Sequence, residues 1–104
     1  IALSQNGTVY LARQNSLHAF SAEDGQELFT APLSGNASAP PTVCSGVVYV
    51  PSDTAHLEAF DAQDGKRLWR YSLYSAANTP AVPFGDSVFI SDKRHIVYRL
   101  KNMD

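Results

Sequence analysis

Apolar and polar residues alternate over short stretches of this chain, and turn residues interrupt the alternation about every ten positions. In the middle of the chain four such stretches follow one another, at residues 39–44, 47–52, 56–61 and 66–72. Alternation over a few residues is typical of strands with one buried face. Since no stretch has the spacing of an amphipathic helix, the pattern predicts four consecutive antiparallel strands.

This four-strand unit is repeated along the chain. The segment 17–29 returns in similar form at 57–69, and the strand around Val48 has counterparts around Val9 and Val88. A period of roughly 40 residues is typical of β-propellers, in which each unit is a small sheet that needs neighbours to cover its faces. We therefore predict an all-β chain of about two and a half four-stranded antiparallel propeller blades.

The repeats also give expected blade boundaries within a single propeller segment spanning residues 1–104. The first blade is expected at residues 1–31, the second at 38–72, and a third that lacks its outer strand at 79–104. Prolines fall in or beside the first strands of the second and third units. Because proline removes a hydrogen-bond donor, we expect these strands at a sheet edge, as the innermost strands of a propeller are.

A tight turn is expected between the third and fourth strands of each unit. In Asp61-Ala62-Gln63-Asp64-Gly65 the carboxylate can accept turn N–H groups and the glycine can supply a positive φ. Ser21 and Gly25 hold the same places in the first unit. The same turn is therefore predicted in both copies.

The residues around this turn resemble the tryptophan-docking motif of PQQ-like (quinoprotein alcohol dehydrogenase-like) β-propellers. The second copy departs from the family pattern once, where Asp64 replaces Thr, and the first copy is a weaker match. The resemblance implies that the final aromatic stacks on the next blade's turn and that small residues lie where sheets approach closely. The expected structural motif comprises Ala19, Gly25, Phe29, Ala59, Asp61, Gly65 and Trp69.

Composition and charge exclude several classes of partner. Lys and Arg total 8 against 10 acids, and the net charge is −2, so no nucleic-acid partner is expected. The apolar runs are far shorter than the ~20 residues of a membrane-spanning helix. Cys44 is the only cysteine, which excludes an intrachain disulfide, and we expect it to be buried as a small hydrophobic residue.

The sequence offers no catalytic constellation. His18, His56 and His95 follow one another at intervals of nearly one repeat, so we expect them at one repeated place and too far apart to share a metal ion. The acids of the turns are explained by turn capping, and neither a nucleophile elbow nor a phosphate-binding loop is present. We predict no catalytic, cofactor-binding or metal-binding residue.

The polar connections between strands are the expected place for binding. The second-to-third strand connections and the blade-to-blade connections should share one end of the propeller, where variable loops on a repeated scaffold commonly bind partners. The expected interaction residues are Arg13, Asn36, Asp53, Asn78, Lys93, Arg94 and His95.

Three functions are compatible with the repeat. The first is a non-catalytic scaffold for protein interaction or sensing, similar to periplasmic assembly lipoproteins and kinase-linked sensor domains. The alternative is a fragment of a PQQ-dependent quinoprotein dehydrogenase, and a third is the lumenal domain of a stress-sensing kinase. By resemblance alone, a periplasmic or extracytoplasmic location is favoured.

The chain is expected to associate with further blades. It begins with Ile1 rather than Met, so we expect that its start was removed by processing or by excision from a longer protein. The partner blades would come from a longer parent chain or from a homo-oligomer. We expect the uncovered blade faces to expose Tyr10, Phe20 and Val88.

Overall fold

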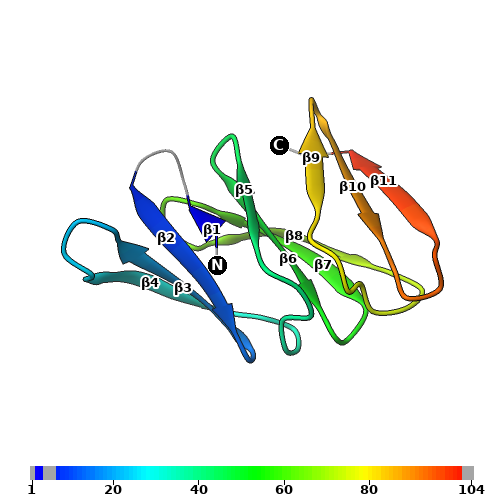
Figure 1. Ribbon diagram of the computed structural model, residues 1–104, viewed down its shortest axis with the longest axis horizontal. Helices are drawn as coiled ribbons and strands as arrows, with labels where there is room; N and C mark the ends of the chain where they lie inside the picture. The colour runs from blue at the N-terminus through cyan, green and yellow to red at the C-terminus, as the bar shows by residue number, and fades with distance from the viewer. Residues whose placement is uncertain (1, 4–6, 102–104) are drawn as a thin grey trace.

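The computed structural model describes residues 2–3 and 7–101, and its regular structure is entirely β (Figure 1). The first sheet has the order β1 (Ala2–Leu3), β2 (Thr8–Arg13), β3 (Ser16–Ser21), β4 (Glu27–Pro32). The second has the order β5 (Thr42–Cys44), β6 (Val47–Ser52), β7 (His56–Asp61), β8 (Arg67–Ser72). The third contains β9 (Val82–Phe84), β10 (Ser87–Ser91) and β11 (Val97–Lys101), with β10 in the centre. All neighbouring strands are antiparallel, and the prediction of antiparallel propeller blades is confirmed.

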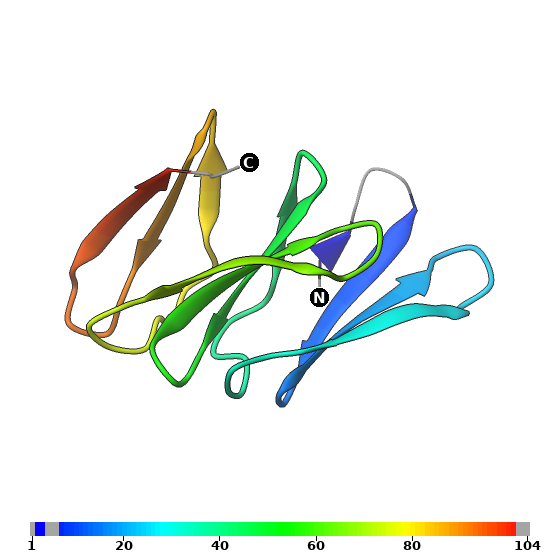
Figure 2. The same ribbon diagram turned by 180° about the vertical axis from the view of Figure 1, so that it is seen from behind.

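The three sheets stand side by side, and Figure 2 shows the same row from behind. Their first strands lie at one edge of each sheet, and the hydroxyl of Thr42 in β5 donates a hydrogen bond to the carbonyl of Ala81, beside β9 (2.8 Å). The strand β5 begins at Thr42 rather than at residue 39 as predicted. Pro40 and Pro41 precede it and cannot donate to a ladder, so regular pairing starts only after them.

Apolar side chains fill the spaces between neighbouring sheets. One cluster joins the first sheet to the second and includes Tyr10, Leu17, Val48 and Phe60. A second cluster joins the second sheet to the third and includes Tyr49, Leu57, Val88 and Tyr98. Alternate residues of a strand point to opposite faces, so the second sheet, which lies between the other two, contributes to both clusters.

Two expectations about exposure are wrong. Tyr10 and Val88 are buried, because each faces the second sheet, and Phe20 is half-buried. Cys44 is exposed, because it ends the short edge strand β5 beside a turn and no sheet covers it. The apolar side chains that remain exposed on the third sheet are Val82, Phe84 and Val97.

The turn between the third and fourth strands has the same geometry in both copies. Gly25 and Gly65 have φ values of 74° and 78°, and their N–H groups donate to Ser21 and Asp61 carbonyl oxygens at 2.8 and 2.9 Å. The Asp61 carboxylate also accepts the N–H of Gln63 at 2.8 Å. Asp61 and Gly65 therefore shape the second turn in the way that their residue types predict.

Phe29, the aromatic residue that ends the motif in the first blade, packs on the turn between the third and fourth strands of the second blade. A Cβ placed on Gly65 would collide with the Phe29 ring, so the ring rests directly on the glycine. Ala19 and Ala59 are fully buried between sheets. Trp69 is half-buried with its ring centroid 6.0 Å from that of Tyr49, and the turn on which the resemblance would place it lies outside the described residues.

This contact predicts unequal effects of two matching substitutions. Gly65→Ala and Gly25→Ala each place a side chain at positive φ, at a cost of about 1 kcal/mol. Only Gly65→Ala also collides with an aromatic ring, since the space around Gly25 is open. We expect Gly65→Ala to lower the free energy of unfolding by about 1–3 kcal/mol more than Gly25→Ala. Equal losses in urea denaturation would show that Phe29 does not hold this position.

Candidate functional site

One end of the row of sheets is formed by two kinds of connection that lie against each other. We call this end the loop face: it comprises the β2–β3, β6–β7 and β10–β11 connections and the blade-to-blade connections β4–β5 and β8–β9. The β4–β5 connection binds the first sheet's own hairpin, because Leu33 N–H donates to Asn15 O and Ala37 N–H donates to Gln14 O, both at 2.8 Å. It is therefore fixed to the blade that it leaves.

The same connection is also fixed to the blade that it enters. Asp53 N–H donates to Asn36 O at 2.7 Å, and Asn36 N–H donates to the Asp53 carboxylate at 3.0 Å. A Cβ on Gly35 would collide with the Asp53 and Thr54 side chains. Glycine thus allows the two loops to approach closely, and a larger residue there would force the Asp53 and Thr54 side chains to move.

The pattern recurs one blade later. Leu73 N–H donates to Ala55 O at 2.7 Å, and Lys93 N–H donates to Ala76 O at 3.0 Å. The β8–β9 connection therefore joins the second hairpin to the third, as β4–β5 joins the first to the second. Backbone hydrogen bonds make the loop face continuous across all three blades.

The structure brings the predicted interaction residues to this one end. All of them are exposed: Arg13, Asn36, Asp53, Asn78, Lys93, Arg94 and His95. Most of their side chains are available to a partner, although the Asp53 carboxylate already accepts Asn36 N–H. The loop face thus presents cationic groups on its first and third hairpins and an acid on its second.

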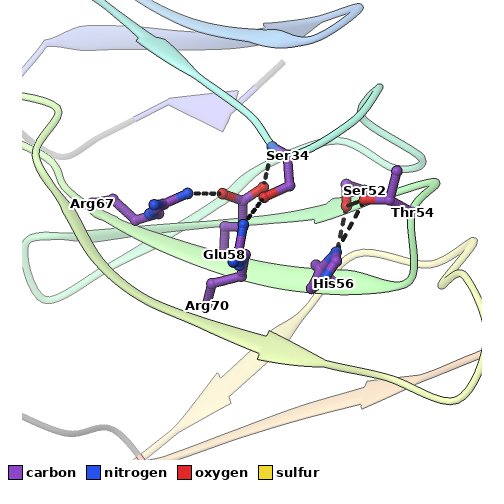
Figure 3. Close-up of polar contacts among 7 residues, drawn as sticks. All are labelled: Ser34, Ser52, Thr54, His56, Glu58, Arg67 and Arg70. Carbon is purple, nitrogen blue, oxygen red and sulfur yellow. Dashed lines mark hydrogen bonds and ion pairs between the residues drawn. The ribbon is translucent and has the colours of Figure 1, made fainter.

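Beneath the loop face, a buried carboxylate ties the first blade to the second (Figure 3). Glu58 of β7 is fully buried, and its carboxylate accepts Ser34 N–H from the β4–β5 connection at 2.7 Å. The half-exposed Arg67 lies 3.3 Å from the same carboxylate. Arg70 donates to the Ser34 hydroxyl at 2.8 Å, so the connection is held from both sides.

A phenol performs the same task between the second and third blades. Tyr98 has the position in the third repeat that Glu58 has in the second, and Tyr74 likewise corresponds to Ser34. The Tyr98 hydroxyl accepts the N–H of Tyr74 at 2.8 Å and donates to the buried Asp92 carboxylate at 2.7 Å. At both blade junctions, therefore, a side chain on the third strand of one blade accepts a hydrogen bond from a backbone N–H of the connection that enters this blade.

Asp92 is held as a carboxylate by its hydrogen bonds. Burial acts to raise the pKa of Asp92, but donation from Tyr98 and from the N–H groups of Ile96 and Arg94 outweighs it, and the pKa is lowered from its ordinary value. Burial and the neighbouring Asp92 carboxylate raise the pKa of Tyr98. Both shifts favour the ionised acid and the neutral phenol that form the hydrogen bond.

Sequence reasoning missed Glu58, Asp92 and Tyr98 as junction residues. A signal was present for Glu58: an acid stands between Leu57 and Ala59 in a strand whose interior is otherwise apolar. No such indication was present for Tyr98. It stands where the second repeat has Glu58, and a phenol resembles a carboxylate only in its ability to accept a hydrogen bond.

The three histidines do not occupy one repeated position, so that interpretation is wrong. His18 is the third residue of β3, His56 begins β7, and His95 lies before β11 with a φ of 65°. The even spacing is misleading because the hairpin connections differ in length among the blades. Among the described residues, no group of three or more His, Cys, Asp or Glu could hold a metal ion.

The Glu58 junction can be tested by alanine substitution. Glu58→Ala leaves Ser34 N–H without its acceptor and opens space between blades, so we expect a loss of about 2–4 kcal/mol in unfolding free energy. Glu27→Ala is a matched control, because Glu27 also pairs across its hairpin, with His18 at 2.9 Å, but is 46% exposed. Its loss should stay below about 1 kcal/mol. Similar losses for both variants in chemical denaturation would contradict the buried tie.

The Asp92 network predicts an acid-sensitive contribution to stability. Because the folded-state pKa of Asp92 is lowered, its contribution is fully present above the unfolded-state pKa of about 3.9 and is lost as the pH falls through the folded-state value. Asp92→Asn should remove this part of the pH dependence, measured as melting temperature between pH 7 and pH 2. Asp86→Asn removes an exposed carboxylate and is the control. An unchanged slope in Asp92→Asn would disprove the assignment.

Comparison with solved structures shows the same fold. The chain superposes on BamB from Moraxella catarrhalis with a TM-score of 0.86 and 19% identity, over 97% of this chain and 31% of that one. The computationally designed protein Ika4 gives a TM-score of 0.80 at 17% identity, over 96% of this chain and 63% of that one. Ika8, also designed, gives 0.73 at 17% identity, over 94% and 31%. This chain thus spans about a third of the length of BamB.

Sequence comparison identifies the family. No curated protein gives a significant match. None of the described residues belongs to a helix that could cross a bilayer. A family model described as outer membrane protein assembly factor BamB matches residues 1–100. The chain therefore belongs to the PQQ-like β-propeller repeat family that this model describes.

Proposed function

We propose that this chain is part of a propeller that acts as a protein-interaction scaffold, and that its loop face is the binding surface. The observation that carries the proposal is the continuity of that face: each blade-to-blade connection is hydrogen-bonded to the hairpins on both sides of it. Loops that are already ordered lose little conformational entropy on binding. Such a surface is suited to holding a partner across several blades.

The charges of the loop face favour a partner with acidic groups at its ends. Lys93 and Arg94 are exposed side by side on the third hairpin, and Arg13 is exposed on the first. Across a protein interface, opposite charges steer encounter and fix the orientation of the partner. The acid Asp53 between them would disfavour a uniformly acidic surface. A protein with separated acidic patches fits this pattern better than a polyanion.

Membership of the family gives the proposal a biological direction. The family model that matches this chain carries the description outer membrane protein assembly factor. We infer that the propeller containing this chain serves in outer membrane protein assembly by holding another protein of that process. With this role we also propose a periplasmic location for it.

The loop face can be tested by photo-crosslinking within the protein that contains this chain. A photoreactive amino acid at Asn78, on the loop face, should crosslink to a protein partner in cells. The same group at Gln63, in the turn at the other end of the second sheet, should not. Crosslinking at Gln63 but not at Asn78 would place the binding surface elsewhere.

Charge reversal then tests the proposed electrostatics on the partner identified in this way. We expect Lys93→Glu with Arg94→Glu to weaken binding about tenfold or more in calorimetry, with a smaller difference at high salt. The control pair is Lys66→Glu with Lys101→Glu, which makes the same change of charge at the opposite end. An equal loss in both double variants would indicate a general charge effect and contradict the proposed surface.

A further inference from the structure

Residues with a positive φ are divided unevenly between the two ends of the row of sheets. On the loop face, among the residues that the structure describes, positive φ falls on Gln14, Ala55 and His95 and on no glycine. Of the described residues at the opposite end, which we call the turn end, Ser45 has a positive φ together with five glycines: Gly7, Gly25, Gly46, Gly65 and Gly85. A residue with a side chain is strained at positive φ, so each of the three on the loop face needs a reason.

Packing supplies a reason at two of these positions. Ala55 is half-buried and packs on the apolar cluster between the second and third sheets. Its N–H donates to Ser52 O at 3.2 Å, and the N–H of His95 donates to Asp92 O at 3.0 Å in the third hairpin. The two residues thus hold the same place in their hairpins. The place of His95 is therefore the one that packs against a following blade.

The side chain of Gln14 has no such reason. Gln14 is exposed and belongs to neither apolar cluster. Its carboxamide forms no hydrogen bond or ion pair with any residue in the described part of the chain. The blade that follows this hairpin is part of the chain, and it leaves Gln14 uncovered. Contacts within the fold therefore do not explain why this residue has a side chain.

The turn that contains Gln14 is one in which glycine is ordinarily found. Arg13 pairs with Ser16, so Gln14 and Asn15 form a two-residue connection with a positive φ at its first residue only. This is the form of a type II′ turn, whose first position is usually glycine.

The turn end contains a turn of the same form. Phe84 pairs with Ser87, and the first of the two residues between them is Gly85, with a φ of 63°. Comparison of the two turns shows that the hairpin needs the backbone conformation and does not need a side chain at the first position.

The backbone beneath the Gln14 side chain is held in place. The carbonyl of Gln14 accepts the N–H of Ala37, and that of Asn15 accepts the N–H of Leu33, both at 2.8 Å. A Cβ on a residue with positive φ leaves the backbone in a direction that is closed to a residue with negative φ. The carboxamide at its end carries one carbonyl acceptor and an NH₂ donor, which complement the N–H and C=O groups of a peptide unit.

We propose that Gln14 is a partner-binding residue of the loop face, and that its carboxamide hydrogen-bonds to a peptide group of the bound protein. This role rests on the proposed function, because it needs a protein partner on this face. Strained residues are common where a ligand is held. The fixed backbone also limits the freedom that the side chain loses when the partner binds.

Two substitutions at this position separate binding from folding in the protein that contains this chain. Gln14→Gly should relieve the strain and raise the melting temperature by about 2 °C, while affinity for the partner crosslinked at Asn78 falls about fivefold. Gln14→Met keeps the length of the side chain and the strain but removes the amide. It should weaken binding equally at an unchanged melting temperature. Ser45→Gly is the matched control, because it relieves strain at the turn end and should raise the melting temperature without changing affinity.

The outcomes distinguish this role from the proposed function. Wild-type affinity in Gln14→Met would show that the amide makes no contact and would overturn the role of Gln14, while a crosslink at Asn78 would still support the loop face as the binding surface. A lower melting temperature in Gln14→Gly would contradict the strain at this turn and would likewise overturn it. Absence of a crosslink at Asn78 would refute the proposed function and the role of Gln14 together.

Discussion

The structure depends on the contact between neighbouring blades, because a four-stranded sheet of this size cannot cover either of its own faces. The apolar clusters fill the spaces between the sheets, but the hydrophobic effect that drives their burial is not directional. Direction comes from the packing of Phe29 on Gly65 and from the hydrogen bond between Ser34 and Glu58. These two contacts lie toward opposite ends of the interface. Together they fix both the separation and the rotation of one blade against the next.

The same contacts explain why the loop face is ordered. Each blade-to-blade connection begins with an N–H held by an acceptor beneath it, Ser34 by Glu58 and Tyr74 by Tyr98. It then passes between two hairpins and hydrogen-bonds to both. A long connection without regular structure would ordinarily be mobile. Here its backbone groups have fixed partners, so packing between blades and order on the binding surface have one cause.

The sequence predicted the features that depend on residue type at a fixed spacing. The repeat period, the turn glycines and the edge prolines led to the blades, because each reports a backbone requirement that few residues satisfy. The junction acceptors could not be predicted in this way, since Glu58 and Tyr98 share a geometric role without sharing chemistry. Cys44 and Tyr10 were misplaced for a related reason. Their burial depends on which face a neighbouring sheet covers, which alternation within one strand does not show.

Variation at the junction acceptor also distinguishes one blade interface from another. A carboxylate oriented by Arg67 and a phenol oriented by Asp92 accept equivalent N–H groups in successive connections but need different surroundings. A second carboxylate beside the buried Asp92 would place two like charges next to each other, which is costly away from solvent. Each acceptor lies in the same blade as the residue that orients it, and the neighbouring blade supplies only a backbone N–H. A blade can therefore change the chemistry of its acceptor while it preserves the backbone geometry that the propeller requires.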